Sequence, residues 1–411
     1  MPTQRIKTLQ SEIFKQIPSP SYVLEEEKLE NNLKILNFIQ EQSGAKILVA
    51  LKGFAFWQSF ALVGKYLQGS TASGIYEAQL AYETLGGREQ NKEVCVFSPA
   101  YKREEIIALL PIATHLIFNS FKQWQTFKPL IDSHNAQNPK KKIQVGLRLN
   151  PLYSEVSPEI YNPCAPKSRL GIAPKEFQYG IEKYGLEGIS GLHFHTHCEQ
   201  NSDALKRTLP HILKYFSSQI AQMQWLNLGG GHHITRKDYD LSLLISLLKD
   251  LKTQFPNLKE IFLEPGEAVG WQCGFLLGEV VDIVQNEGNI AILDVSAAAH
   301  MPDCLEMPYR PNLKKISKGI IEADKGENKA SYQYRLGGPT CLSGDVIGDY
   351  SFDTALEIGD KILFEDMIHY TIVKNNTFNG IPLPSLGIIT KKGEFKLLKQ
   401  FNYSHYKDRN G

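Results

Sequence analysis

The residues best suited to chemistry in this chain are a lysine, a cysteine and an aspartate that stand at the end of an apolar run or on a glycine-rich turn. Lys52 directly follows the apolar run 46–51, which is typical of a buried strand. We expect a lysine in that place to be partly desolvated, which lowers its pKa and makes an uncharged amine available for imine formation. Cys341 and Asp345 lie on the glycine-rich turn 338–345. Such a turn suits a thiol that delivers a proton and a carboxylate that recognises a cationic group.

Two further clusters follow apolar runs. Gly229, Gly230 and Gly231 come directly after the run 225–228. Consecutive glycines let backbone N–H groups approach an anion closely, and the end of a late barrel strand is a common phosphate position. The segment 193–197 carries three histidines. Because a His-x-His pair on a strand places both rings on one face, the segment predicts either a metal site or a ring-stacking histidine with buried neighbours.

The elements that must position these residues are predicted from apolar runs that alternate with amphipathic stretches. The runs typical of buried strands are 46–51, 94–97, 115–118, 143–149, 189–194, 225–228 and 261–263. Helical patterns lie between most of them, and one helix is predicted over 77–85. Repeated strand–helix alternation indicates an α/β fold with a parallel sheet, and its length fits a closed (β/α)8 barrel of the TIM type over residues 23–274.

A different pattern begins after residue 274. Short strands are predicted at 280–284, 291–295, 332–336 and 361–364, with Gly and Asp turns between them. The segment 314–330 is charged and contains glycine, so we expect an exposed loop there. The sequence therefore predicts a second, mostly β domain formed by residues 275–411 together with 1–22.

Composition limits the class of protein. The 42% hydrophobic and 22% charged residues are typical of a globular chain, and the formal net charge of +1 gives no electrostatic reason to expect a nucleic acid or an anionic membrane as a partner. No apolar run reaches the roughly 18 residues that a membrane span needs, and residues 1–10 lack the apolar centre of a signal peptide. The six scattered cysteines are typical of reduced thiols, which predicts a cytoplasmic location.

The order of these landmarks resembles the fold type III decarboxylases that use pyridoxal phosphate (PLP), the alanine-racemase-like family, over nearly the whole chain. The matching segments are Leu51-Lys52-Gly53, Gly191-Leu192-His193-Phe194-His195, the glycines 229–231, Glu264-Pro265-Gly266, the turn 338–345, Tyr370 and Phe378-Asn379-Gly380. The resemblance implies that PLP is the cofactor and that Lys52 holds it as a Schiff base. It also implies that His195 stacks on the pyridine ring and that Glu264 keeps the ring nitrogen protonated, which makes the ring an electron sink.

The same resemblance implies roles for residues outside the barrel strands. Cys341 would return a proton to the α-carbon, and Tyr370 would hydrogen-bond the phosphate. Members of the family usually have an arginine after the Glu-Pro-Gly segment, where this chain has Glu267, so the phosphate needs another partner. Arg148 resembles a family position that lines the barrel mouth. In this family the active sites lie at a dimer interface and the cysteine loop comes from the partner subunit, which implies a homodimer with shared sites.

The segment 300–311 indicates the substrate. It resembles the substrate loop of the branch that decarboxylates carboxynorspermidine and carboxyspermidine in polyamine biosynthesis. Asp303, Glu306 and Asp345 would supply acids for a substrate with several amines. Arg310 keeps open a diaminopimelate or other basic amino-acid decarboxylase, because a cation would bind a distal carboxylate.

A more distant alternative is a metal-dependent barrel hydrolase with His193 and His195 as ligands. No lysine or acid elsewhere has the spacing of a metal hydrolase, so we expect no metal. The sequence indicates no preference between carboxynorspermidine and carboxyspermidine.

Overall fold

The computed structural model describes residues 12–318 and 320–411, and the chain divides into two compact units. The barrel unit comprises Glu30–Val269, and the sheet unit comprises Gly270–Gly411 with the described residues before position 30. Within the described ranges, no helix combines the length and the apolar character needed to cross a membrane.

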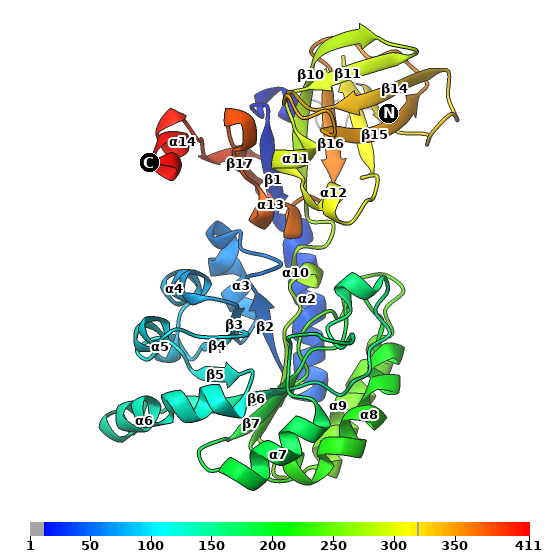
Figure 1. Cartoon of the computed structure of the whole chain (residues 1–411). Helices are drawn as coiled ribbons and strands as arrows, with labels where there is room; N and C mark the ends of the chain where they lie inside the picture. Colours follow the sequence, from blue (N-terminus) through cyan, green and yellow to red (C-terminus); the bar gives the residue numbers. More distant parts are fainter. Residues whose placement is uncertain (1–11, 319) are drawn as a thin grey trace. The chain divides into compact units, whose positions relative to one another are not determined.

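The barrel unit is a closed barrel of eight parallel strands, which confirms the predicted fold class. Consecutive strands pair with one another, and the first pairs with the last (Figure 1). Their bounds are β2 (Lys46–Ala50), β3 (Gly69–Ala72), β4 (Glu93–Phe97), β5 (His115–Phe118), β6 (Gln144–Leu149), β7 (Gly191–Phe194), β8 (Trp225–Asn227) and β9 (Glu260–Leu263). The strand β3 was not predicted, because its sequence Gly-Ser-Thr-Ala has no apolar run although all four residues are buried.

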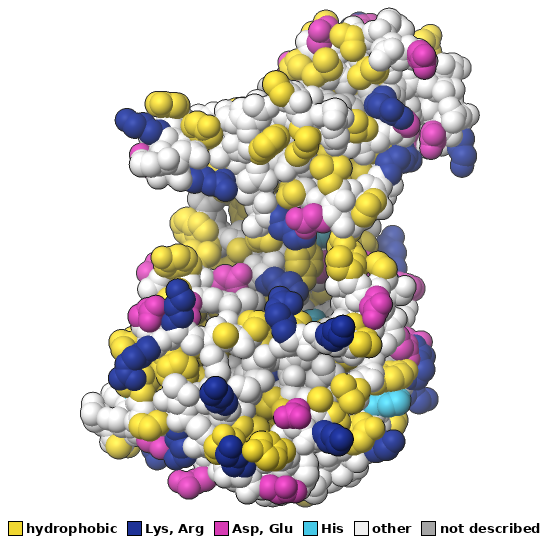
Figure 2. Space-filling view, viewed as in Figure 1, with side chains coloured by type: hydrophobic (Ala, Val, Ile, Leu, Met, Phe, Trp, Pro, Cys, Tyr) yellow, Lys and Arg dark blue, Asp and Glu magenta, His cyan; other side chains and the backbone are white. Residues whose placement is uncertain are grey.

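Helices cover the outside of the barrel (Figure 1). Ser120, Asn201 and Asp240 cap the first turns of α6, α8 and α9 by accepting backbone N–H bonds. The helix bounds are α2 (Glu26–Ser43), α3 (Phe60–Tyr66), α4 (Ile75–Thr84), α5 (Arg103–Leu109), α6 (Phe121–Gln137), α7 (Pro174–Tyr184), α8 (Ser202–Ile220), α9 (Leu241–Gln254) and α10 (Glu267–Gly270). Figure 2 shows charged side chains of both signs interspersed with apolar ones over the visible face of this unit, in keeping with the small net charge.

Aromatic rings fill the barrel interior. They occupy space that side chains on neighbouring strands would otherwise take. The Trp225 ring lies edge-on to the rings of His115 and Phe262, at centroid distances of 5.1 and 6.2 Å. A Cβ atom at Gly146 or Gly191 would overlap the Trp225 ring. Glycine at these two strand positions is therefore a packing requirement.

An ion network closes the end of the barrel where the strands begin. The Lys46 ammonium contacts the carboxylates of Glu93 and Glu260, and Glu93 lies 3.5 Å from Nδ1 of His115. Burial opposes the ionisation of Glu93, but its imidazole and ammonium neighbours outweigh burial and hold its pKa below the usual value. Burial lowers the pKa of His115. Both shifts make the folded state bind fewer protons than the unfolded chain, so the network favours folding at neutral pH and loses strength in acid.

The sheet unit is built around the long strand β10. Its first half pairs with β1 and β16, and its second half pairs with β11 beyond a bulge near Val280. The strand bounds are β1 (Ser21–Glu25), β10 (Gly274–Gln285), β11 (Asn289–Leu293), β12 (Leu313–Ser317), β13 (Ile320–Ala323), β14 (Tyr332–Gly337), β15 (Val346–Phe352), β16 (Lys361–Glu365), β17 (Ser385–Ile389) and β18 (Phe395–Lys399). Short helices accompany them, among them α11 (Ala297–His300), α12 (Asp303–Glu306), α13 (Tyr370–Lys374) and α14 (Tyr403–Asn410).

The expected exposed loop over 314–330 is wrong in its first half, where β12 and β13 pair as antiparallel strands. Lys315 and Glu322 on these strands are buried. The Lys315 ammonium donates to the Ala355 carbonyl at 2.8 Å, and a Glu322 carboxylate oxygen accepts from the Thr354 hydroxyl at 2.6 Å. The charges that suggested a solvated loop are thus satisfied by the neighbouring segment 353–355, which the local sequence pattern could not reveal.

We predict that replacing Glu93 with Gln destabilises the protein at neutral pH and reduces its loss of stability in acid. The folded pKa of Glu93 lies below its ordinary value of 4.5, so its contribution is present above that pH and is lost as pH falls through the folded pKa. The variant should lose about 1–3 kcal/mol at pH 7, because hydrogen bonds to a charged, largely buried group are removed. Urea unfolding at pH 7 and pH 4 measures both effects. Glu89→Gln, at an exposed pair with Lys141, is the control, and an unchanged pH dependence in Glu93→Gln would contradict the prediction.

Candidate active site

The polar side chains predicted to act in the barrel unit lie at the end of the barrel where the strands finish. Lys52 follows β2, His195 follows β7, the glycines 229–231 follow β8 and Glu264 follows β9. Because the strands are parallel and form a closed barrel, their final residues meet at one end. The structure therefore brings these predicted site residues together on one face of the barrel unit.

Glu264 is the buried acid of this face. Its Oε1 accepts a hydrogen bond from Nδ2 of Asn227 at 2.6 Å, and its Oε2 lies 3.4 Å from Nε2 of His193. Burial would raise the pKa of Glu264, but the contacts with His193 and Asn227 outweigh burial and lower it. Glu264 is therefore a carboxylate at neutral pH, with its position fixed from two sides.

Asn227 is a site residue that the sequence analysis missed. Its side chain is buried at the last position of β8, where Oδ1 accepts the N–H of Gly229 at 2.8 Å and Nδ2 donates to Glu264. The backbone N–H of Glu264 also donates to the carbonyl of Gly229, at 2.8 Å. One amide side chain thus joins the glycine turn to the acid. A polar residue that ends an otherwise apolar strand was the signal that could have identified it.

His195 is held in one tautomer by the glycine turn. The N–H of Gly230 donates to its Nδ1 at 2.9 Å, so the ring proton must lie on Nε2. Burial holds the pKa of His195 well below its usual value, and the positive charges of Arg148 and Lys52 lower it further. His195 is therefore a neutral, oriented and half-buried ring.

The glycines 229–231 are required by close packing. Gly229 has φ of +71°, and a Cβ there would lie 2.5 Å from the carbonyl oxygen of Phe194. A Cβ at Gly230 would overlap the carbonyl oxygen of Glu264, and one at Gly231 would overlap that of His197. Two of the three N–H groups already donate within the protein, to Asn227 and to His195. Among the described residues, the N–H of Gly231 has no acceptor, so it is the one best able to meet an anion; phosphate binding by the turn stays a prediction.

Arg148 brings a positive charge into this end of the barrel. Its guanidinium carbon lies 4.5 Å from the centroid of the Phe97 ring, whose other neighbour is the His193 ring at 5.6 Å and 17°. Burial lowers the pKa of Arg148 to about 10, so it is still charged at neutral pH. Nε of Arg148 is buried and lacks a hydrogen-bond partner within the described part of the chain.

Lys52 differs from the expectation in one respect. Its side chain is exposed, so the predicted partial desolvation is wrong for the protein as described. Glycines at positions 53 and 266 lie against each other directly beside it, since a Cβ at Gly53 would be 2.9 Å from Cα of Gly266. The lysine is thus presented on a closely packed backbone, with an exposed side chain.

In the sheet unit, the turn 338–345 presents Cys341 and buries Asp345. Cys341 is exposed. The Asp345 carboxylate is fixed inside the unit: Oδ1 accepts from the Ser296 hydroxyl at 2.9 Å and the Ala298 N–H at 3.1 Å, and Oδ2 accepts from the Thr340 hydroxyl at 2.7 Å. These bonds shape the turn. Recognition of a substrate amine by Asp345 stays a prediction, and it would have to compete with them.

The other three charged residues predicted to bind substrate have different surroundings. Asp303 is buried; Oδ2 accepts from the Tyr309 and Thr371 hydroxyls at 2.8 and 3.0 Å, whereas Oδ1 has no hydrogen-bond partner among the described residues. Glu306 is more exposed and forms an ion pair with Lys374 at 2.5 Å. Arg310 pairs with Asp324 at 2.7 Å and lies 4.4 Å from the centroid of the Tyr350 ring. Of the three, Asp303 retains a buried acceptor atom for a cationic group.

Tyr370, the predicted phosphate ligand, and Glu267, which stands where the family has arginine, lie in short helices. Tyr370 begins α13 and is half-buried, with its ring edge-on to His369. Glu267 begins α10, and its carboxylate lies 4.0 Å from Nε2 of the buried His233. The acid that replaces the expected arginine is therefore accompanied by an imidazole from the loop after β8.

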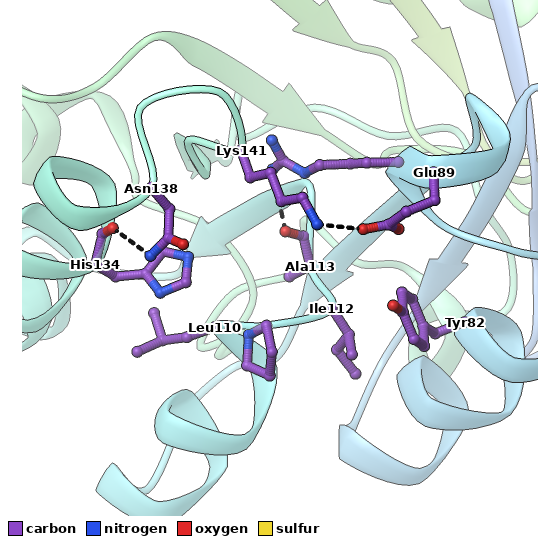
Figure 3. A pocket seen from close by; sticks show the side chains of 10 residues that line it. Tyr82, Glu89, Leu110, Ile112, Ala113, His134, Asn138 and Lys141 are labelled. Atoms are coloured by element: carbon purple, nitrogen blue, oxygen red, sulfur yellow. Dashed lines mark hydrogen bonds and ion pairs between the residues drawn. The ribbon is translucent and has the colours of Figure 1, made fainter.

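A pocket of about 170 Å³ lies at the opposite end of the barrel, beside residues that precede β4, β5 and β6 (Figure 3). Arg88 in its wall donates to the carbonyls of Lys142, Ala113 and Thr114, and Lys141 pairs with Glu89. These contacts join three loops to one another. No predicted site residue lines this pocket, and we assign it no chemistry.

The metal interpretation of the histidine segment has no structural support within the described residues, where no group of three or more His, Cys, Asp or Glu is arranged to hold a metal ion. His193 faces Glu264, and His195 accepts a backbone N–H bond. The histidines therefore act as hydrogen-bonding and packing residues of the barrel end.

Comparison with known proteins gives matches over almost the whole chain. Residues 22–368 match the family model described as "Pyridoxal-dependent decarboxylase, C-terminal sheet domain". The chain is 45% identical to a carboxynorspermidine/carboxyspermidine decarboxylase of Campylobacter jejuni, over 97% of this chain and 100% of that protein. It is 40% identical to a carboxyaminopropylagmatine decarboxylase of Synechocystis, over 99% of each. The crystal structure of carboxynorspermidine decarboxylase complexed with norspermidine from Campylobacter jejuni matches with a TM-score of 0.82 and 44% identity, covering 96% of this chain and 100% of that one.

We predict that Gly230→Ala weakens the binding of PLP. The added Cβ would overlap the carbonyl oxygen of Glu264, so the turn must move and take His195 with it. Overpacking of this kind costs about 1–3 kcal/mol, which corresponds to a roughly 5- to 150-fold loss of affinity in a titration followed by the visible absorbance of bound PLP. Gly288→Ala, where a Cβ meets nothing within 4 Å, is the control. Equal PLP affinity in the two variants would contradict the prediction.

Proposed function

Because the chain belongs to the pyridoxal-dependent decarboxylase family, we propose that it decarboxylates carboxynorspermidine and carboxyspermidine, giving norspermidine and spermidine. The observation that carries this proposal is the full-length similarity to the Campylobacter enzyme of that name, whose crystal structure holds norspermidine. The alternatives of a diaminopimelate decarboxylase and of a metal-dependent hydrolase have less support, because Arg310 is paired with Asp324 and the histidines serve as hydrogen-bonding residues.

The residues at the strand ends of the barrel fit PLP in their chemistry. The amine of the exposed Lys52 side chain can hold the aldehyde carbon, and the neutral His195 ring can stack on a pyridine face without adding charge. The Glu264 carboxylate can keep a pyridine nitrogen protonated. When bound, PLP supplies the electron sink that lets the substrate's carboxylate leave as CO₂. Lys52, His195 and Glu264 would bind and orient it, and the low pKa of Glu264 keeps the charge that this role needs.

Loss of CO₂ leaves an electron pair on the α-carbon, which must take up one proton. We assign its delivery to Cys341, whose thiol is exposed on the turn of the sheet unit. A thiol can give a proton to carbon and regain it from solvent. The N–H and hydroxyl groups around Asp345 would keep the turn in shape during this step.

Recognition of the substrate's amines rests on Asp303. A buried carboxylate oxygen without a hydrogen-bond partner is costly unless a cation or donor meets it. A secondary ammonium in the tail of carboxynorspermidine would satisfy this atom. Glu306 is paired with Lys374, so it would add a weaker attraction for the substrate's amines at longer range.

A second candidate substrate is carboxyaminopropylagmatine, in view of the similarity to the Synechocystis enzyme of that name. Its tail ends in a guanidinium group, whereas the first candidate ends in an amine. Both tails are cationic and suit Asp303, so the charge of the site does not distinguish them.

The test is CO₂ release by the purified, PLP-loaded protein from carboxynorspermidine, carboxyspermidine, carboxyaminopropylagmatine, diaminopimelate and ornithine. We expect turnover of the first two within about 10–200-fold of one another, because they differ by one methylene, and little turnover of diaminopimelate and ornithine. A higher kcat/KM for carboxyaminopropylagmatine would select the second candidate. A preference for diaminopimelate would overturn the proposal.

We predict that Asp303→Asn lowers kcat/KM for carboxynorspermidine at least about 30-fold, the equivalent of 2 kcal/mol for one partner lost from a buried charge pair. Asparagine keeps the shape and an acceptor for Tyr309 and Thr371, so the fold should persist. Asp353→Asn, at a more exposed pair with Lys325, is the matched control. Equal kinetics in the two variants would remove Asp303 from recognition.

We also propose that the protein is a homodimer in which Cys341 serves the site of the partner subunit. A Lys52→Ala subunit mixed with a Cys341→Ala subunit should then regain activity, because one of the two sites in each heterodimer has both residues. Random mixing should restore about a quarter of the sites. Activity of refolded or co-expressed mixtures measures this, and demonstrated heterodimers without activity would mean that each chain builds its own site.

A further inference from the structure

Cys341 is held by a side chain from a different turn of the sheet unit. Its backbone N–H donates to Oδ1 of Asn379 at 2.7 Å. Among the described residues, this is the only hydrogen bond found for Cys341. The residues on either side of Cys341 are held within the turn, because the Thr340 hydroxyl donates to Asp345 at 2.7 Å and accepts from the Leu342 N–H at 3.4 Å. Asp345 is fixed in turn by Ser296 and Ala298. The peptide that carries the exposed thiol is therefore held by one hydrogen bond of its own, to Asn379 outside the turn.

Asn379 is itself firmly placed. It has φ of 60° and ψ of 12°, in the left-handed region, and Gly380 follows with φ of +76°. The Gly380 N–H donates to the Thr377 carbonyl at 3.1 Å, and the Phe378 N–H donates to Oδ1 of Asn376 at 2.8 Å. Asn376 in turn donates to the carbonyls of Ala298 and Ala299.

These contacts connect the two turns through one short helix. Ala298 donates its N–H to Asp345 and accepts from Asn376, so α11 holds both the turn of Cys341 and the turn of Asn379. From the other side, Arg409 of α14 donates to the Thr377 hydroxyl at 3.3 Å. Asn379 thus projects from a braced segment toward the Cys341 peptide, for which no other hydrogen bond is found among the described residues.

We propose that Asn379 is the positioning residue for the Cys341 thiol. This inference rests on the role assigned to Cys341 under the proposed function. Proton transfer to carbon requires the donor at hydrogen-bond distance from its target, and a displacement of about 1 Å can cost 10²-fold in rate. Asn379 does not need to touch substrate; its carbonyl oxygen fixes the peptide that carries the thiol.

The residue type follows from two demands on this position. The backbone must adopt a positive φ, which Asn, Asp and Gly accept more readily than other residues. The side chain must also place an acceptor toward the Cys341 N–H. Asp meets both demands, and Gly meets the first alone. The two substitutions therefore separate the acceptor from the backbone conformation.

The experiment compares Asn379→Gly and Asn379→Asp, each in the native background and in a Cys341→Ala background. We expect Asn379→Gly to lower kcat about 10–100-fold, with KM within about threefold of the native value, because positioning for the proton step is lost and substrate binding is kept. Asn379→Asp should recover most of kcat. In the Cys341→Ala background, Asn379→Gly should cost less than about twofold more, since the group it positions is already absent.

Asn328→Gly is the matched control. Asn328 also has a positive φ, of 57°, and lies on an exposed turn of the same unit. It should leave kcat unchanged. Thermal unfolding of every variant checks that the sheet unit remains folded.

The outcomes separate the inference from the proposed function. A native kcat in Cys341→Ala would remove Cys341 as the proton donor and the inference with it. A large loss in Cys341→Ala with a native kcat in Asn379→Gly would overturn the inference and leave the function standing. Losses from Asn379→Gly and Cys341→Ala that multiply in the double variant would show that Asn379 acts independently of the thiol. An Asn379→Asp variant as impaired as Asn379→Gly would exclude the acceptor role.

Discussion

The barrel end depends on the amide of Asn227, which joins the turn after β8 to the acid after β9. Its carbonyl oxygen takes the Gly229 N–H and its amide nitrogen donates to Glu264, so neither group can move without the other. Through Gly230 the same turn fixes the tautomer of His195. Because both the oxygen and the nitrogen of this buried amide are hydrogen-bonded, its side chain is held in one orientation. An apolar residue at this position could not join the two segments in this way. The three consecutive glycines are what let the turn pass close enough to β7 and β9 for these bonds to form.

Much of the fold could be predicted from the sequence, because the barrel strands are buried on both faces and appear as apolar runs. The exceptions have one cause. The strand β3 is composed of small residues, and β12 and β13 carry Lys315 and Glu322 inside the sheet unit. In each case these residues are buried against parts of the chain that are distant in sequence, as Lys315 is against the carbonyl of Ala355. The periodicity of a local segment carries no information about such contacts.

The residues of the candidate site also differ in whether a local sequence pattern could identify them. Lys52, His195 and Glu264 stand out in the sequence because each is a polar residue at the end of an apolar run, and the structure places them at one end of the barrel. Asn227 and Asn379 act through hydrogen bonds to backbone groups, and an asparagine in a turn or at a strand end has many ordinary explanations. The expected desolvation of Lys52 failed because a strand end is also the edge of the barrel, where a long side chain can reach solvent.

The charges of the sheet unit favour a cationic tail over a distal carboxylate. To bind a carboxylate, Arg310 would have to give up its ion pair with Asp324 and its contact with the Tyr350 ring, and Asp324 would lose its ion-pair partner. For Asp303, binding a cation is favourable. Its Oδ1 is buried without a hydrogen-bond partner among the described residues, and a bound ammonium would remove the free-energy cost of that burial. Breaking a pair is unfavourable and completing one is favourable. The difference between these two residues, rather than the number of acids in the segment, is therefore the physical reason to expect a polyamine-type substrate.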